Sequence, residues 1–316
     1  MAYIGVDLGG TKLASAAFTD RGELLYRESV PLAQRRGADV GSLIADRVRE
    51  IGGKYGCEGA GVCIPGLYRA ARGTVWAPNI PGWDDYPLLD ELRSALGDAS
   101  PVTIDSDRAA YILGETWRGA AQGARDAIFL AVGTGIGAGI LADGRVLRGH
   151  GDVAGAIGWM AMDRPFRARW KIHGCFEDQA SGPGLVRVAG DLMQISSGYG
   201  GDLRRKPSEP LDATEIFAAY DAGDMIATLV IDNAIEMWGM AAANLVSLFN
   251  PQIIVFGGGV FGPATKYLER IKREAKRWAQ PIAIEQVEFV GSTLGSDAGL
   301  FGAGRLAMTP QGEGEW

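Results

Sequence analysis

Cysteine is scarce in this sequence, which contains only Cys57, Cys63 and Cys175. No two of these residues form a CxxC pair, and an odd number of thiols cannot all pair within one chain. Small domains that depend on disulfides carry an even number of cysteines at short spacings. We therefore expect a protein without a disulfide framework.

Two other features are missing. No apolar run approaches the length of a membrane span, and the N-terminus lacks a charged region followed by an apolar one. These absences predict a cytoplasmic protein that does not bind a membrane. An excess of positive charge is missing too, because the net charge is -7. This balance argues against a nucleic-acid partner, although local geometry can still hold a small anionic ligand.

The sequence does contain a globular composition with abundant glycine. Hydrophobic residues make up 47% and charged residues 22% of its 316 residues. These values suit a folded chain of about two domains. The 47 glycines gather in turns that follow apolar runs. Because glycine lets backbone N–H groups approach an anion closely, these turns are the candidate ligand sites.

The first glycine turn follows the apolar run at residues 4–6 and contains Asp7, Gly9, Gly10, Thr11 and Lys12. The glycines and the lysine predict a phosphate-binding turn. A carboxylate this close to phosphate requires a cation, and Mg²⁺ bridging carboxylate, water and phosphate would satisfy both groups. A simple β-hairpin is the alternative, because residues 14–18 and 23–30 continue as strands. The two interpretations are compatible.

Apolar periodicity predicts an α/β chain in which strands and helices alternate. Strands are expected at residues 4–6, 14–18, 23–30, 59–64, 101–105, 127–132, 140–142, 253–256 and 287–290, with an extended segment at 75–76. Helices are expected at residues 40–55, 88–96, 106–117, 183–195, 213–222, 225–249, 263–279 and 297–307. Residues 79–83, 160–176 and 196–210 are expected to be irregular. Strands followed by a helix occur twice, which indicates an internal duplication of architecture.

Two later glycine turns repeat the logic of the first. The strand at residues 127–132 breaks into Gly133, Thr134, Gly135 and Gly137 before it resumes, which predicts a second phosphate-binding hairpin. The strand at residues 253–256 runs into a third turn of three consecutive glycines at 257–259. That turn could face the adenosine end of a nucleotide at a helix start. A tight strand-to-helix connection is the simpler alternative.

In order, these motifs resemble those of the ROK sugar kinases, the family that includes bacterial glucokinases and fructokinases. The matching segments are DLGGTK at residues 7–12, IPG at 64–66, APNIPGW at 77–83, the acidic turn at 105–107, GTGIGAG at 133–139 and NPQIIVFGGG at 250–259. The resemblance spans residues 3–308 and implies an α/β, two-domain actin-like (ribonuclease H-like) ATPase fold with an interdomain cleft. It implies a small domain of residues 1–117 plus 297–316, to which the last helix returns. It also implies a larger domain of residues 118–296 and a homodimer.

The resemblance implies roles for individual residues. Asp107 is the implied base that accepts the proton of the sugar hydroxyl, and Asp105 is the alternative. A purely structural alternative is that Asp107 complements the dipole of the helix it begins. ATP and Mg²⁺ are the implied cofactors, with Asp7 holding Mg²⁺ through water. The implied nucleotide-binding residues are Asp7, Gly9, Gly10, Thr11, Lys12, Gly133, Thr134, Gly135, Gly137, Gly257, Gly258 and Gly259.

On the sugar side the chain departs from its family. The implied sugar-binding residues are Pro65, Gly66, Asn79, Ser106, Asp107, Ala156, Trp159 and Glu177. Family members usually carry AGExGH where this chain reads AGAIGW at residues 154–159. A carboxylate and an imidazole are thereby replaced by a methyl group and an indole. We expect recognition at that end of the sugar to be relaxed or redirected. The asparagine that often follows the base by two positions is Ala109.

The family's CxCGxxGCxE zinc motif is also reduced. Residues 160–174 contain no cysteine, and only His173 and Cys175 remain of the donor set. Because a structural Zn²⁺ needs four ligands, no zinc is expected. The replacement loop instead carries Arg164, Arg167, Arg169 and Lys171. These residues indicate either a solvated basic loop or recognition of an anionic group on the substrate.

Together these features predict an ATP-dependent sugar kinase that phosphorylates a hydroxyl of a hexose or hexose derivative, with the primary 6-hydroxyl as the expected acceptor. A kinase for an amino sugar or a cyclitol is one alternative. A non-catalytic sugar or nucleotide sensor with the same fold is the other. Asp7, Lys12 and Asp107 favour the kinase, because a sensor needs no proton acceptor.

Overall fold

The computed structural model describes residues 1–97, 101–204 and 211–309, which divide into two compact units. Unit 1 consists of Met1–Arg125, Gly139–Gly155 and the chain from Ser292 onwards, and unit 2 of Asp126–Ala138 and Ala156–Gly291. Compared with the division expected from the sequence, residues 118–125, 139–155 and 292–296 lie in unit 1. The predicted domain boundaries stay a prediction.

Unit 1 is built on a five-stranded mixed sheet with the order β3-β2-β1-β4-β7. Its strands are β1 (Tyr3–Leu8), β2 (Lys12–Phe18), β3 (Leu24–Pro31), β4 (Gly59–Ile64) and β7 (Val102–Ser106). β1, β2 and β3 pair antiparallel, whereas β1, β4 and β7 run parallel. The hairpin expected around the first glycine turn is therefore present. A separate pair, β5 (Leu67–Arg69) and β6 (Thr74–Trp76), follows β4.

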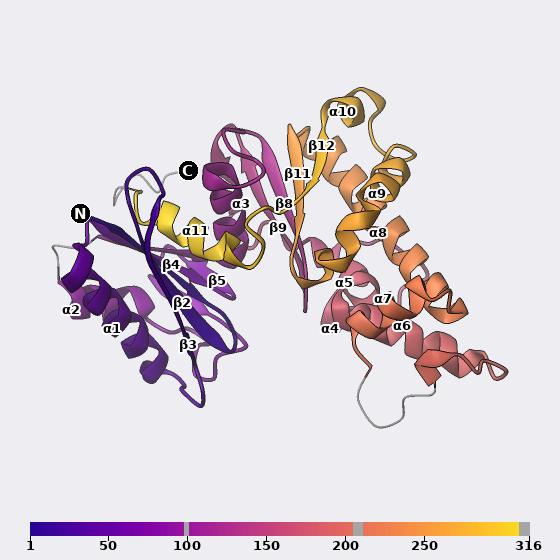
Figure 1. Ribbon diagram of the computed structural model, residues 1–316, viewed down its shortest axis with the longest axis horizontal. Coiled ribbons are helices and arrows are strands. Elements are labelled where there is room, and N and C mark those ends of the chain that lie inside the picture. Colours follow the sequence, from indigo (N-terminus) through magenta and orange to yellow (C-terminus); the bar gives the residue numbers. More distant parts are fainter. Residues whose placement is uncertain (98–100, 205–210, 310–316) are drawn as a thin grey trace. The chain divides into compact units, whose positions relative to one another are not determined.

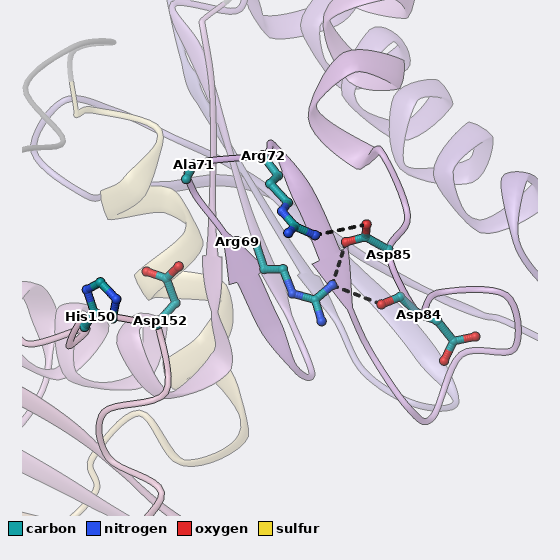
Figure 2. A pocket seen from close by; sticks show the side chains of 8 residues that line it. Arg69, Ala71, Arg72, Asp84, Asp85, His150 and Asp152 are labelled. Carbon is teal, nitrogen blue, oxygen red and sulfur yellow. Dashed lines mark hydrogen bonds and ion pairs between the residues drawn. The ribbon is translucent and has the colours of Figure 1, made fainter.

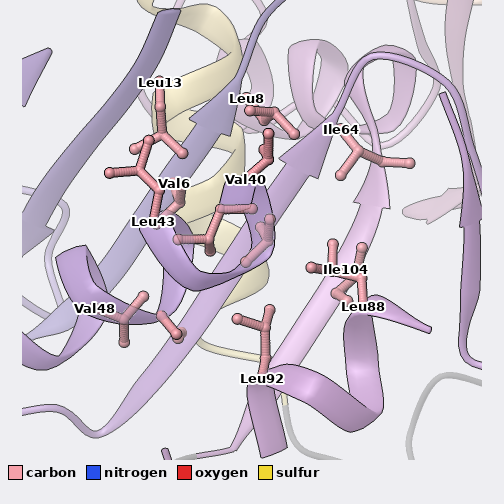
Figure 3. Packing of buried hydrophobic residues seen from close by; sticks show 14 of the residues in the cluster. Val6, Leu8, Leu13, Val40, Leu43, Val48, Ile64, Leu88, Leu92 and Ile104 are labelled. Carbon is pink, nitrogen blue, oxygen red and sulfur yellow. The ribbon is translucent and has the colours of Figure 1, made fainter. Parts of the chain in front are cut away.

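One face of this sheet forms the main core of unit 1. Helices α1 (Ala38–Tyr55) and α2 (Leu88–Leu96) pack on it, and apolar side chains from alternate strand positions meet them (Figure 3). Val6, Ile64 and Ile104 belong to this core. Because side chains alternate along a strand, the residues beside them point to the opposite face. That alternation sends the polar ends of β1, β4 and β7 away from the main core.

The opposite face is covered by α3 (Asp107–Arg118) and by α11 (Ala298–Leu306), which is yellow in Figure 1. A Cβ atom on Gly61 would overlap the carbonyl oxygen of Ala303, and one on Gly302 would overlap that of Ala110. Glycine at these positions lets α11 pack backbone to backbone on β4 and α3. The last helix therefore packs within unit 1, against strands and a helix from the first part of the chain.

The second sheet has the order β10-β9-β8-β11-β12. Its strands are β8 (Ala127–Val132), β9 (Ile136–Ala142), β10 (Arg145–Val146), β11 (Ile253–Gly257) and β12 (Glu288–Gly291). β8, β11 and β12 run parallel, and β9 and β10 pair antiparallel. The boundary between the units falls within β9, after Ala138. Both sheets are mixed.

The helices of unit 2 match the periodicity in most segments. They are α5 (Cys175–Ala180), α6 (Gly182–Ile195), α7 (Ala213–Asp221), α8 (Met225–Phe249) and α9 (Leu268–Ala275). The expectation that residues 160–176 are irregular was wrong in part, because this segment contains α4 (Trp170–His173) and the start of α5. The helix expected at 263–279 begins as a 3₁₀ turn at Pro263–Tyr267, and α10 (Pro281–Gln286) was not predicted. The expected loop at 196–210 contains a 3₁₀ turn at Asp202–Arg204, and residues 205–210 lie outside the described residues.

Helix α8 is long and apolar enough by length and composition to cross a membrane, contrary to the expectation that no run approaches that length. It packs against α6, α7 and α9, and most of its apolar residues are buried. Buried core helices of globular proteins have the same composition. The packing therefore makes α8 the central helix of unit 2.

Candidate active site

Asp7, Cys63 and Asp105 occupy neighbouring positions at the carboxyl ends of three parallel strands. In the register of β1, β4 and β7, Asp7 pairs with Cys63, and Cys63 pairs with Asp105. Burial raises the pKa of the Cys63 thiol well above its usual value, and the charges of Asp7, Asp107 and Asp105 raise it further. Three carboxyl groups therefore converge around one buried thiol of unit 1. The ends of parallel strands are where α/β proteins commonly place their ligands.

Asp107 is the first residue of α3 and follows β7 directly. The Ser106 hydroxyl caps this helix by accepting a hydrogen bond from the Ala109 N–H at 3.3 Å. The Asp107 carboxylate accepts from the Arg108 N–H at 2.8 Å. Burial raises the pKa of Asp107 to about 6, Arg108 opposes the rise, and Asp7 adds to it. A carboxylate with this pKa is ionised at neutral pH yet takes up a proton more readily than an ordinary aspartate.

Asp105, the alternative base, is engaged by an arginine. Nε of Arg148 donates to its Oδ2 at 3.1 Å, and Nη2 of Arg148 donates to the same oxygen. The other oxygen accepts from the Ser106 N–H at 2.8 Å. Burial raises the pKa of Asp105, although Arg148 opposes that shift. With both oxygens occupied, Asp105 is less free than Asp107 to accept a substrate proton.

Arg148 was not identified from the sequence, because it belongs to no motif and follows the short strand β10. Its side chain is mostly buried, with 24% exposed. Its Nη1 is buried and has no hydrogen-bond partner among the residues that the structure describes. Buried polar groups normally have partners, so this nitrogen is a donor available to a ligand.

Asp7 lies against the first turn of α11. A Cβ atom on Gly299 would come within 2.6 Å of Oδ2 of Asp7, so glycine is required for this approach. Burial raises the pKa of Asp7 to about 6, opposed by its hydrogen bond with Cys63 and by the charge of Lys12. Asp297 adds to the rise. Gly299, like Arg148, was not identified from the sequence. Nothing in the sequence of the last helix indicates that this helix packs against β1, which carries Asp7.

The mutual repulsion of the carboxyl groups around Cys63 suits the binding of a divalent cation. The nearby charge of Asp7 raises the pKa of Asp107, and a cation would relieve that repulsion. Across the described residues, no group of three or more His, Cys, Asp or Glu side chains is arranged to hold a metal by itself. Mg²⁺ commonly takes one or two carboxylates and completes its shell with water and phosphate oxygens. The donor set fits such a water-bridged ion.

The first glycine turn is exposed and lies beside a predicted sugar contact. The Gly9 N–H donates to the Lys12 carbonyl at 2.9 Å, and Gly10, Thr11 and Lys12 are exposed. A Cβ atom on Gly10 would lie 3.7 Å from Cβ of Asn79, whose side chain is also exposed. Unit 1 therefore brings the predicted phosphate turn and one predicted sugar-binding residue together.

Pro65 and Gly66 follow β4 immediately, next to the strand ends that carry the carboxylates. A Cβ atom on Gly66 would overlap the carbonyl oxygen of Trp76 on β6. Glycine is thus needed for the β5–β6 pair to fold back on this turn. The family resemblance implies sugar contacts at this turn, and that role stays a prediction.

In unit 2, Glu177 supports the second glycine hairpin. Its Oε2 accepts a hydrogen bond from the Ile136 N–H at 2.8 Å, and a Cβ atom on Gly135 would lie 2.9 Å from that oxygen. Burial raises the pKa of Glu177, which the bond from Ile136 opposes. The Gly133 carbonyl accepts from the Gly182 N–H at 2.9 Å, while Thr134 is exposed. The role implied for Glu177 in sugar binding stays a prediction, and the observed contacts assign it to the hairpin.

The remaining predicted residues of unit 2 are distributed over two turns. Gly258 has φ 88°, and a Cβ atom there would overlap the Val132 carbonyl, whereas Gly259 faces open space. Ala156 is partly buried, and Trp159 is 55% exposed at the end of a short 3₁₀ turn. An exposed indole in this position is available for stacking on a ligand.

The loop that replaces the zinc motif is tied by a buried carboxylate. Asp178 is fully buried and pairs with Nε of Arg169 at 2.7 Å and Nε of Arg187 at 2.9 Å. Nε1 of Trp170 donates to Asp178 at 3.2 Å. Arg169 also pairs with Asp191 at 2.7 Å. Arg169 is therefore a structural residue of this loop and not a solvated charge.

A separate open pocket of about 680 Å³ lies within unit 1 (Figure 2). Arg69 and Arg72 line one side and His150 and Asp152 the other. Both arginines are engaged by Asp85, Arg69 at 2.6 Å and Arg72 at 3.7 Å. The pocket includes none of the carboxylates around Cys63. It is therefore distinct from the candidate active site.

Comparison with known proteins gives a consistent result over the whole chain. The family model described as "ROK family" matches residues 3–309. The chain is 35% identical to a glucokinase of Halalkalibacterium halodurans, covering 96% of this chain and 94% of that one. It is 28% identical to an N-acetyl-D-glucosamine kinase of Escherichia coli, covering 97% and 99%. A crystal structure of a ROK family glucokinase from Streptomyces griseus with glucose and AMPPNP superposes with a TM-score of 0.73 at 28% identity, covering 97% and 99%.

Proposed function

The chain belongs to the ROK family, and from this premise we propose that it transfers the γ-phosphoryl group of ATP to the primary hydroxyl of a hexose, with Asp107 as the general base. The protein has the two-domain actin-like fold of these enzymes and is an ATP-dependent sugar kinase. The acceptor, the metal and the residue roles below are proposals.

The observation that carries the proposal is the position of Asp107. It begins a helix at the end of a parallel strand and has a pKa raised to about 6. Among the residues that the structure describes, no arginine side chain pairs with its carboxylate as Arg148 pairs with Asp105. In the proposed step the sugar oxygen forms a bond to the γ-phosphorus as the bond from that phosphorus to the β–γ bridging oxygen breaks. The hydroxyl proton passes to Asp107, and ADP leaves.

We propose that the phosphates of ATP are held by glycine turns of both units. Lys12 and the amide of Gly10 in unit 1 supply positive charge and a donor, with Gly9 shaping the turn, and the amides of Thr134 and Gly135 in unit 2 supply a second set. The triglycine turn at 257–259 is the proposed contact of the adenosine end. Mg²⁺, held by Asp7 through water, would neutralise charge on the β- and γ-phosphate oxygens.

Glucose is the proposed first acceptor, because a relative that is 35% identical over 96% of this chain is a glucokinase. Asn79, Gly66 and the free Nη1 of Arg148 are proposed to bind its hydroxyls. Ala156 and Trp159 lack the carboxylate and imidazole of the family pattern, so this end offers space and an aromatic face in place of two hydrogen-bonding groups. An N-acetylated hexose is the second acceptor, since another relative is an N-acetyl-D-glucosamine kinase.

A coupled assay of ADP release tests the proposal with glucose, mannose, fructose, N-acetylglucosamine, glucosamine and inositol. We expect sugar-dependent turnover with a hexose, and a loss on the order of 10² to 10⁴ in kcat for Asp107→Asn. Asp105→Asn is the control and should chiefly raise the KM for the sugar. If no acceptor supports turnover while the protein binds sugar or nucleotide, the sensor alternative replaces the kinase.

The homodimer implied by the family resemblance and the cytoplasmic location stay predictions. Light scattering of the purified protein measures the assembly directly. A monomeric mass at working concentrations would contradict the expected homodimer, without bearing on the catalytic proposal.

A further inference from the structure

The chain passes between unit 1 and unit 2 four times, at 125/126, 138/139, 155/156 and 291/292. Any movement of one unit relative to the other must be carried by these four connections. In each case the residues on the unit 1 side belong to a segment that contacts one helix, α3. The contacts come from the two ends of that helix, Arg108 in its first turn and Glu115 in its last.

Glu115 holds the first and fourth connections. Its side chain is fully buried. Oε2 accepts a hydrogen bond from the Ala120 N–H at 2.7 Å, in the segment that leads out to unit 2. Oε1 accepts from the Ser292 hydroxyl and from the Leu294 N–H at 3.4 Å, in the segment that returns from unit 2. A single carboxylate therefore ties the outgoing and the returning chain to α3.

Gly119 shows how tightly this arrangement is built. A Cβ atom on Gly119 would overlap Oε2 of Glu115. The chain thus turns directly over the carboxylate as it leaves the helix. A buried carboxylate is costly to desolvate and is maintained only where several donors converge on it. An apolar side chain could fill the space but could not hold two separate segments in one place.

At Arg108, the side chain holds the third connection and the helix backbone packs on the second. Its Nη1 donates to the Ala154 carbonyl at 3.2 Å, just before the chain enters unit 2 at Ala156. A Cβ atom on Gly139 would overlap the backbone carbonyl of Arg108, so the strand that returns at Gly139 packs on the helix backbone at the same residue. Arg108 is also the residue that follows Asp107, the proposed base.

We propose that Glu115 and Arg108 are positioning residues for phosphoryl transfer, fixing all four connections to the helix that carries the base. This inference rests on the proposed function, because Asp107 matters only if it is the base. With the connections held to α3, the points at which the chain leaves and re-enters unit 1 keep a constant place relative to Asp107. A base held in a constant place relative to these points favours phosphoryl transfer to the sugar over transfer to water.

Glu115→Gln is the main test, because it keeps the shape of the side chain but replaces an acceptor oxygen by a donor. Glu269→Gln, at an exposed position on α9, is the matched control. We expect Glu115→Gln to lower kcat and raise the KM values of sugar and ATP together, by on the order of tenfold. We also expect an increase in the fraction of ATP hydrolysed without sugar phosphorylation. The acid limb of the pH profile should not move, because Asp107 itself is unchanged.

A purely structural role predicts a different pattern. In that case Glu115→Gln lowers the melting temperature, while the folded fraction keeps the wild-type kcat and the wild-type ratio of sugar phosphorylation to ATP hydrolysis. That result overturns the inference. If Glu115→Gln does not fold, Ser292→Ala removes one donor from the fourth connection, and a wild-type hydrolysis ratio in this variant also overturns the inference.

Hydrogen exchange separates this inference from the proposed function. In Glu115→Gln the amides of Ala120 and Leu294 should exchange at least tenfold faster than in Glu269→Gln, whether or not a sugar is phosphorylated. Unchanged exchange at both amides shows that Glu115 does not hold the connections. A third outcome is faster exchange of these amides in Glu115→Gln together with a wild-type protein that phosphorylates no sugar. This outcome confirms the anchoring contacts, overturns the catalytic role assigned to them, and counts against the proposed function.

Discussion

Arg148 binds the carboxylate of Asp105 through Nε, at 3.1 Å, and Nη2, while its Nη1 is buried without a hydrogen-bond partner among the described residues. Arg148 therefore does two things in unit 1. It engages the Asp105 carboxylate, which would otherwise compete with Asp107 as the base, and it leaves its own Nη1 as an oriented donor for a ligand. A lysine in this position could not supply both, because it lacks the planar fork of the guanidinium group.

Arg148→Lys is expected to raise the KM for the sugar by about 10- to 100-fold, since a hydrogen bond to a charged group is worth about 1.5–3 kcal/mol. The KM for ATP should change much less. Steady-state kinetics with each substrate varied separately provide the measurement. Arg49→Lys, at a half-exposed position on α1, is the matched control. Equal changes in both KM values would show that Arg148 does not act on the sugar.

The pH dependence of kcat/KM should have an acid limb near pH 6. Burial raises the pKa of Asp107 to about 6, and only the ionised form accepts a proton from the sugar. Activity should therefore be complete above pH 7 and fall about tenfold for each pH unit below the limb. A profile measured between pH 4.5 and 8.5 under ATP saturation tests this. A limb near pH 4 would mean that the base has an ordinary carboxyl pKa.

Asp107→Asn should be more stable than the wild type at neutral pH. The folded protein binds the Asp107 proton more tightly than the unfolded chain, because the pKa rises from 3.8 to about 6 on folding. Unfolding free energy therefore falls as pH rises from about 4 to about 6, and the ionised carboxyl then costs on the order of 1–3 kcal/mol. Chemical denaturation at pH 4 and pH 7 should show a difference between variant and wild type only at pH 7. The same difference at both values would contradict the burial of a charged Asp107.

Gly299→Ala should impair ATP use more than sugar binding. The new methyl group would lie 2.6 Å from Oδ2 of Asp7 and displace the carboxylate proposed to hold Mg²⁺. We expect a rise of about tenfold or more in the KM for MgATP, on the scale of a misplaced catalytic group. Gly53→Ala is the control, because that helical glycine faces open space and alanine favours the helix by about 0.5–1 kcal/mol. Unchanged ATP kinetics in Gly299→Ala would exclude Asp7 from the metal site.

Asp178→Asn should destabilise the protein by about 3 kcal/mol, whereas a chelator should have no effect. The substitution leaves Arg169 and Arg187 without the buried charge that pairs with both. Asp143→Asn is the control, since its ion pair with Arg125 is exposed and contributes about 0–1 kcal/mol. Thermal unfolding with and without EDTA gives both measurements. A lower melting temperature in EDTA would show that a metal stabilises this protein after all.

Most local elements could be predicted from the sequence, because their signals are local. The strand ends at Asp7 and Asp105 follow from apolar runs, and the start of α3 follows from a capping Ser106 placed before a periodic segment. The segment at 160–176 could not be predicted, because its helical turns are held by contacts with the buried Asp178, outside that segment. Short helices have weak local preferences and depend on such tertiary contacts.

The order of apolar runs and glycine turns in the sequence alone predicted a phosphate-binding α/β protein, and the family resemblance implied Asp107 as the base. The tertiary structure decided which carboxylates are free and which are occupied. Arg148 reaches Asp105 from 43 residues away, Gly299 meets Asp7 from the last helix, and Glu177 is taken up by the second glycine hairpin. These pairings depend on strand register and on the close packing of α11, which bring together residues that carry no signal of one another in the chain.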